Sequence, residues 1–118
     1  MKQLLLYFFT LASFTSYSQE NSNDIEEIKS VIIEETKENG KLDFFTPIKG
    51  KEYDGYQVKP GLYASNREMA LYNWAKAAKD LGVNDLEELY ILYAEARNKE
   101  ITTMEKDLLK MGFNKELD

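Results

Sequence analysis

The 118-residue chain contains no cysteine and no histidine, and these two absences remove several kinds of chemistry. Without cysteine the protein has no disulfide framework, no thiolate metal ligand, no cysteine nucleophile and no cysteine acceptor for a lipid. Without histidine it lacks the side chain that most often serves as a metal ligand and as a general base near neutral pH. Carboxylate, Lys, Tyr, Ser and Thr side chains remain for catalysis, but they form no recognisable catalytic motif here, so we expect no metal site, no cofactor and no enzymatic activity, with an enzyme that uses carboxylates as the third hypothesis.

The chain also has fewer positively charged than negatively charged residues. The chain has 15 Lys and Arg residues against 21 Asp and Glu residues, which gives a formal net charge of −6. Nucleic acids and anionic membrane surfaces are poor partners for such a chain. An acidic surface instead favours association with a basic protein, because opposite charges steer the encounter.

The first 18 residues have the three parts of an export signal. Lys2 provides the positive start, residues 4–14 form a short apolar run, and Ser16 and Ser18 are the small residues of a cleavage site. A membrane-spanning helix needs roughly 20 apolar residues, so we expect cleavage, with a retained signal anchor as the alternative. This predicts a disordered segment at 19–23 and one helical domain at 24–118, periplasmic or secreted, with no stable membrane anchor after cleavage.

Three stretches of the chain carry the start and stop signals of helices. In each, a capping residue precedes a glutamate by three positions, a glycine follows, and apolar residues recur between them at helical spacing. The pairs of start and stop are Asn23 with Gly40, Ser65 with Gly82, and Asn84 with Gly112. A further capping box at Thr102 and Glu105 predicts that the third stretch bends or restarts there.

The helical period is lost between residues 41 and 64, where aromatic residues are interleaved with proline and glycine. This pattern predicts a long loop or a short β-hairpin between the first two helices. The second and third helices are separated by a short corner, which predicts an αα-hairpin. The expected fold class is therefore mainly α, a small bundle of three to four helices with an aromatic-rich segment between helices one and two.

One set of candidate binding residues consists of three residues at helical spacing on one face of the third helix and two residues on the second helix. Tyrosine, tryptophan and arginine concentrate binding energy at protein interfaces, so we predict a contact site for a protein partner. The alternative is that the stripe belongs to the core, with Arg97 stacked on Tyr93 or paired with Glu100. The set consists of Tyr72, Trp74, Tyr90, Tyr93 and Arg97.

A second set lies in the aromatic segment. These side chains either dock on the helices and close the core or line a pocket for a small ligand. The set consists of Phe44, Phe45, Tyr53, Tyr56 and Tyr63.

These features favour a small exported binding protein without catalysis, which acts through protein–protein contact. An inhibitor or immunity protein for an exported enzyme is the specific form of this hypothesis. A small-ligand carrier with a pocket in segment 41–64 is the alternative. Paired carboxylates can hydrolyse glycosides or bind calcium, but the acidic residues here are better interpreted as a solvated face. The sequence identifies neither the partner nor the oligomeric state.

Overall fold

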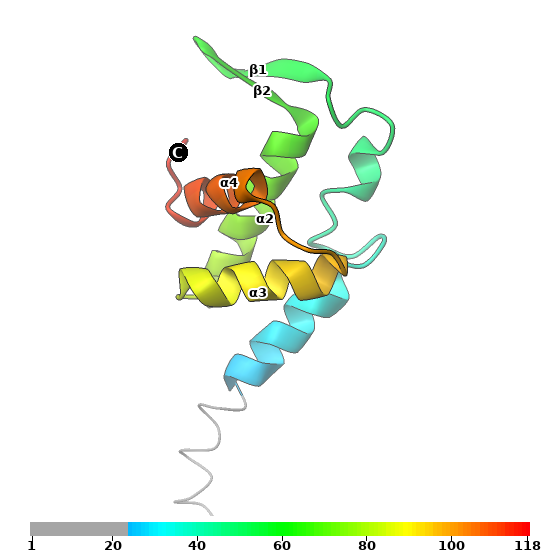
Figure 1. Ribbon diagram of the computed structural model, residues 1–118, viewed down its shortest axis with the longest axis vertical. Helices are drawn as coiled ribbons and strands as arrows, with labels where there is room; N and C mark the ends of the chain where they lie inside the picture. Colours follow the sequence, from blue (N-terminus) through cyan, green and yellow to red (C-terminus); the bar gives the residue numbers. More distant parts are fainter. Residues whose placement is uncertain (1–23) are drawn as a thin grey trace, which may run out of the picture.

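The computed structural model describes residues 24–118 and consists mainly of helices (Figure 1). The elements are a first helix at residues 24–36, a 3₁₀ turn η1 (Thr46–Ile48), strands β1 (Gly55–Lys59) and β2 (Leu62–Ser65), and helices α2 (Asn66–Leu81), α3 (Leu86–Arg97) and α4 (Thr103–Phe113). The predicted fold class is confirmed. The predicted export signal at 1–18, the segment 19–23 and the cap at Asn23 lie outside the described residues. Within 24–118 no helix is long and apolar enough to cross a membrane.

Helix α2 has the bounds that the sequence predicts, because both of its ends are marked. The Ser65 hydroxyl accepts the backbone N–H of Glu68 at 3.1 Å, and the Glu68 carboxylate accepts the Ser65 N–H at 2.9 Å. The helix ends at Gly82, whose φ of 125° suits glycine. A second reciprocal capping box forms at Thr102, so α3 and α4 are separate helices.

Two predicted helix ends shift by a few residues. The cap of α3 is Asp85 rather than Asn84, and its carboxylate accepts a backbone N–H of the first turn at 3.3 Å. Asparagine and aspartate are both favourable N-cap residues, so the sequence alone does not show which of the two adjacent residues caps the helix. The first helix ends at Thr36 rather than Gly40, because the chain turns back there and the backbone N–H of Leu42 donates to the carbonyl of Glu35 at 2.9 Å. A Cβ on Gly40 would lie 2.1 Å from the carbonyl oxygen of Glu35.

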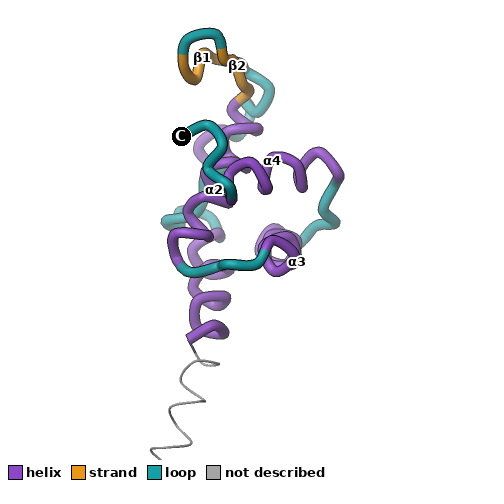
Figure 2. Tube along the Cα trace, turned by 90° about the vertical axis from the view of Figure 1, so that its left-hand side faces the viewer, coloured by secondary structure: helices purple, strands orange, loops and turns teal. Residues whose placement is uncertain are grey.

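The prediction that Gly112 ends the last helix is wrong, since α4 continues to Phe113. Gly112 instead lets α4 approach α2 closely: a Cβ there would lie 2.2 Å from the carbonyl oxygen of Tyr72 and 3.0 Å from Cβ of Ala75. The most extensive contact among α2, α3 and α4 is therefore between α2 and α4. Helix α3 follows α2 after a turn at residues 82–85 and runs across it (Figures 1 and 2).

Segment 41–64 contains a β-hairpin as well as the 3₁₀ turn. Strands β1 and β2 pair antiparallel, with an irregularity between Gln57 and Lys59. Pro60 and Gly61 connect them, and the φ of 80° at Gly61 is typical of a proline–glycine turn. The hairpin extends away from the helices, next to the start of α2 (Figures 1 and 2).

Trp74 lies at the centre of the core and is completely buried. Its ring meets the ring of Tyr93 edge to face, with 5.3 Å between the centroids. The indole N–H donates to the hydroxyl of Thr36 at 3.0 Å, and that hydroxyl donates to the carbonyl of Ile32 at 2.5 Å. The core is thus closed without leaving the polar edge of Trp74 unpaired.

Candidate functional site

The residues predicted to contact a partner do not form one exposed surface. Tyr72, Trp74 and Tyr93 are buried, Tyr90 is half-buried, and only Arg97 is exposed. These side chains therefore belong mostly to the core, where Tyr93 packs against Trp74 and Phe45. Within this set, a partner protein would have access to Arg97 and to the exposed part of Tyr90.

The side chain of Arg97 takes a position that the sequence did not predict. Its guanidinium lies over the ring of Phe45, 3.9 Å from the centroid, rather than on Tyr93 or against Glu100. Phe45 itself packs near Tyr93, with 6.3 Å between the ring centroids. The aromatic segment thus supplies the surface on which the arginine stacks, a favourable cation–π arrangement.

The aromatic residues of segment 41–64 divide into two groups rather than enclosing one pocket. Phe44 and Phe45 are half-buried against the core, whereas Tyr53, Tyr56 and Tyr63 are exposed. Phe45 borders one cavity, Phe44 and Tyr56 border another, and Tyr63 borders a third. The predicted set therefore does not surround a single cavity.

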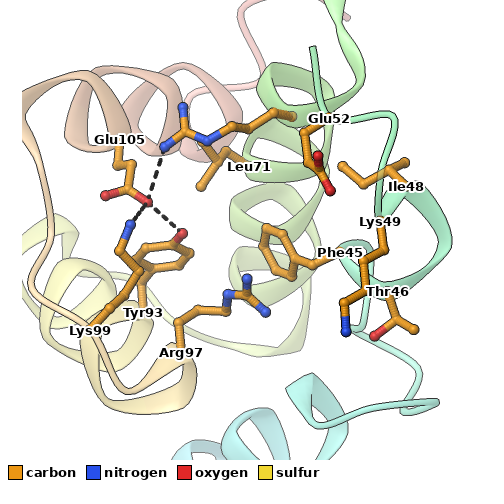
Figure 3. A pocket seen from close by; sticks show the side chains of 11 residues that line it. Phe45, Thr46, Ile48, Lys49, Glu52, Leu71, Tyr93, Arg97, Lys99 and Glu105 are labelled. Atoms are coloured by element: carbon orange, nitrogen blue, oxygen red, sulfur yellow. Dashed lines mark hydrogen bonds and ion pairs between the residues drawn. The ribbon is translucent and has the colours of Figure 1, made fainter. Parts of the chain in front are cut away.

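A cavity of about 340 Å³ lies between the 3₁₀ turn, the start of α2 and the end of α3 (Figure 3). Its lining combines apolar surface with an excess of positive charge, and it includes both arginines of the chain. The apolar side chains are Phe45, Ile48 and Leu71; the cationic ones are Lys49, Arg67, Arg97 and Lys99; the carboxylates are Glu52 and Glu105.

Glu105 is the buried anion at the centre of this region, with 1% of its surface exposed. One carboxylate oxygen accepts the Tyr93 hydroxyl at 2.8 Å and the Lys99 ammonium at 2.6 Å, as Figure 3 shows. The same oxygen lies 3.6 Å from the guanidinium of Arg67, and the other oxygen accepts the backbone N–H of Thr102 at 3.0 Å. The carboxylate is therefore satisfied by three helices and their connections.

The surroundings of Glu105 and Tyr93 shift the pKa values of the two side chains in opposite directions. Burial alone would raise the pKa of Glu105, but the hydrogen bonds from Lys99, Thr102 and Tyr93 outweigh it and lower the pKa to about 2. Burial and the bond to the Glu105 carboxylate raise the pKa of Tyr93 above its ordinary value. At neutral pH the pair is therefore a carboxylate and a neutral phenol.

The sequence does not reveal this cavity, because the charged residues that line it are spread over residues 49–105 and no spacing rule connects them. Two features of the sequence are related to this cavity. One is the capping box at Thr102 and Glu105, and the other is that the chain has two arginines, Arg67 and Arg97, which both line it. The box predicts a helix start, but it does not predict that the same glutamate pairs with other helices.

Comparison with protein-family models, with curated proteins and with solved structures found no match for this chain. Across residues 24–118, no three His, Cys, Asp or Glu side chains are grouped so that they would hold a metal ion. Among residues 24–118, the exposed tyrosines of segment 41–64 and the cationic cavity are two features suited to binding.

Proposed function

We propose that this chain is a small exported binding protein without catalytic activity, which acts by contact with a partner protein. The observation that carries the proposal is the exposure of three tyrosines near or on the hairpin: 82% for Tyr53, 72% for Tyr63 and 43% for Tyr56. Tyrosine offers a large, rigid contact area and a polar tip, so it contributes strongly where a partner covers it.

The hairpin geometry supports this role. Tyr56 is opposite Ala64 in the register and Tyr63 is opposite Gln57, so the two tyrosines lie on opposite faces of the two-stranded sheet. The hairpin stands away from the helices (Figure 2). A partner therefore has access to aromatic side chains from more than one direction.

The charge of the chain favours a basic partner. The net charge of −6 attracts a cationic protein and accelerates their association at low salt. Together with the export signal predicted at residues 1–18, this supports an inhibitor or immunity protein that binds an exported enzyme.

The protonation states of the buried pair do not suit it to acid–base catalysis. A general acid or base is most effective when its pKa lies near the working pH. The pKa of about 2 for Glu105 and the raised pKa of Tyr93 place both groups far from neutral pH. Their hydrogen bonds are accounted for by packing between helices.

The alternative, a carrier whose pocket is formed by the aromatic residues of segment 41–64, has less support. Those residues border three different cavities, and Tyr53 borders none of them. A ligand would meet at most two of their rings in any one cavity.

The test is affinity capture of envelope and secreted proteins from the native host at low and high salt, with mass spectrometry as the readout. The wild-type protein is compared with a Tyr53→Ser, Tyr63→Ser double variant. The control is Ile91→Ser, which removes an apolar side chain that is 62% exposed on α3. We expect one stoichiometric, salt-sensitive partner that the control retains and the double variant loses. Equal capture by all three proteins, or no partner at either salt concentration, would contradict the proposal.

A further inference from the structure

We infer that the cavity beside Arg97 binds a carboxylate carried by a small apolar molecule, a function separate from partner contact at the hairpin. The volume of about 340 Å³ lies within the range of small-molecule sites. One part of the wall is apolar, formed by Phe45, Ile48 and Leu71, and another part is cationic. These two kinds of surface match a ligand with an apolar body and a negative end.

The positive charge in the cavity exceeds what the protein itself neutralises. Two of the four cationic side chains already face Glu105. Arg97 and Lys49 form no ion pair with any carboxylate in residues 24–118. The second carboxylate of the lining, Glu52, accepts a backbone N–H of its own loop at 2.6 Å. An anionic ligand would therefore meet two cations that have no internal counterion.

Arg97 is held in an orientation suited to a carboxylate. The central carbon of its guanidinium lies over the ring of Phe45, 3.9 Å from the centroid, so the ring covers one side of the group. A guanidinium can offer two parallel N–H donors to one carboxylate. Figure 3 shows Arg97 and Lys49 reaching into the region beside Phe45 from different elements.

The same surroundings favour a carboxylate over phosphate. A singly charged carboxylate on an apolar body loses less hydration on entering a partly apolar cavity than a doubly charged phosphate does. The ring of Phe45 and the side chains of Ile48 and Leu71 gain contact only from a ligand that has such a body. Both charge and shape therefore point to a small organic acid.

The experiment is an NMR titration of the ¹⁵N-labelled full chain with sodium benzoate. We expect saturable shifts of the backbone amides at residues 46–49 and 97–99, with a Kd on the order of 1 mM. Benzamide has nearly the same shape without the charge, N-acetylglutamate amide has a carboxylate without an aromatic ring, and inorganic phosphate has charge without an apolar body. We expect each of these three to bind at least about fivefold more weakly than benzoate. Equal or tighter binding of any of them would overturn the assignment.

Three variants locate the binding. Arg97→Gln should weaken benzoate binding by roughly tenfold or more, and Lys49→Gln by roughly threefold, because each removes one charge at the cavity. Lys110→Gln removes the same charge from an exposed position on α4 and should leave the affinity unchanged. Amide spectra outside the cavity serve as the check that each variant is folded. Wild-type affinity in folded Arg97→Gln and Lys49→Gln, or an equal loss in Lys110→Gln, would overturn the inference.

Discussion

Within residues 24–118, the tyrosines on the helices and those in segment 41–64 differ in how far they are buried. Tyr72 and Tyr93 are buried on α2 and α3, whereas Tyr53 and Tyr63 are largely exposed. Helical spacing places side chains on one face, which other elements cover. A two-stranded hairpin has no further layer to cover its faces. The same residue type therefore stabilises one region and remains available for contact in the other.

The hydroxyl groups of the buried and the exposed tyrosines also differ, in the hydrogen bonds that they form. The Tyr93 hydroxyl donates to Glu105 at 2.8 Å, and the Tyr72 hydroxyl donates to Asp118 at 2.8 Å. The Tyr72 oxygen also accepts the backbone N–H of Leu117 at 3.0 Å. Within residues 24–118 the exposed tyrosines of segment 41–64 make no comparable side-chain bonds. Buried tyrosines are thus fixed by specific partners, whereas the exposed ones keep their hydrogen-bonding capacity for water or another molecule.

The largest effect on stability is expected at the centre of the helical region. Trp74→Ala removes a fully buried ring and its bond to Thr36, and should lower the free energy of unfolding by about 3–5 kcal/mol. Urea denaturation followed by circular dichroism measures the change. A loss below about 1 kcal/mol would mean that the buried aromatic residues do not carry the stability of this region.

A smaller loss is expected where two helix backbones meet. Gly112→Ala places a Cβ against the carbonyl oxygen of Tyr72, so α4 must move away from α2, at a cost of roughly 2 kcal/mol. Gly55→Ala is the matched change in the hairpin, where the nearest atom would be 3.8 Å away, and it should change the stability by no more than about 0.5 kcal/mol. Equal effects of the two substitutions would remove the distinction between the regions.

The buried carboxylate gives the helical region a specific pH dependence. The pKa of Glu105 is about 2 in the folded protein against an ordinary value of 4.5, so between these pH values the unfolded chain binds the extra proton. Its contribution to stability is therefore complete above pH 4.5 and is lost as the pH falls toward 2. Glu105→Gln should lower the free energy of unfolding at neutral pH by about 1–2 kcal/mol.

Measurement of the free energy of unfolding at decreasing pH distinguishes the contribution of Glu105 from that of carboxylates in general. Glu105→Gln should flatten the decline in stability between pH 4.5 and 2. The exposed control Glu116→Gln removes the same formal charge and should keep the wild-type decline. An unchanged slope in Glu105→Gln would show that other carboxylates control acid unfolding.

The smallest effect on stability is expected in the hairpin. Tyr63→Ala removes a ring that is already 72% exposed, so the free energy of unfolding should change by less than about 0.5 kcal/mol. The same urea titration measures it. A loss of more than about 1.5 kcal/mol would mean that Tyr63 supports the fold and would weaken its assignment to partner contact.

The sequence predicts helix ends well where several signals agree. Ser65 with Glu68 and Gly82 fix both ends of α2, and Thr102 with Glu105 predicts the start of α4. It fails where one residue type has two roles. Glycine ends a helix or admits a close neighbour, and only the position of α2 shows that Gly112 does the second. Adjacent capping residues are ambiguous for a similar reason, since either can bond the first turn.

The candidate sites were less predictable, because exposure depends on which elements cover one another. Spacing predicts Tyr93 on one helix face with Tyr90 and Arg97, but it could not show that other elements cover Tyr93. The position of Arg97 over Phe45 depends on a segment about fifty residues away in the chain, which has no helical period to predict its path. Long-range contacts of this kind leave no local pattern in the sequence.

The bonds to Glu105 also restrict how the protein can open. The carboxylate closes the first turn of α4, accepts the Tyr93 hydroxyl from α3 and faces Arg67 at the start of α2. Fraying of α4 from its N-terminal end would therefore release contacts on all three helices together, rather than unwind one turn. In native-state hydrogen exchange, amides in the first turn of α4 and the last turn of α3 should consequently exchange as one cooperative unit.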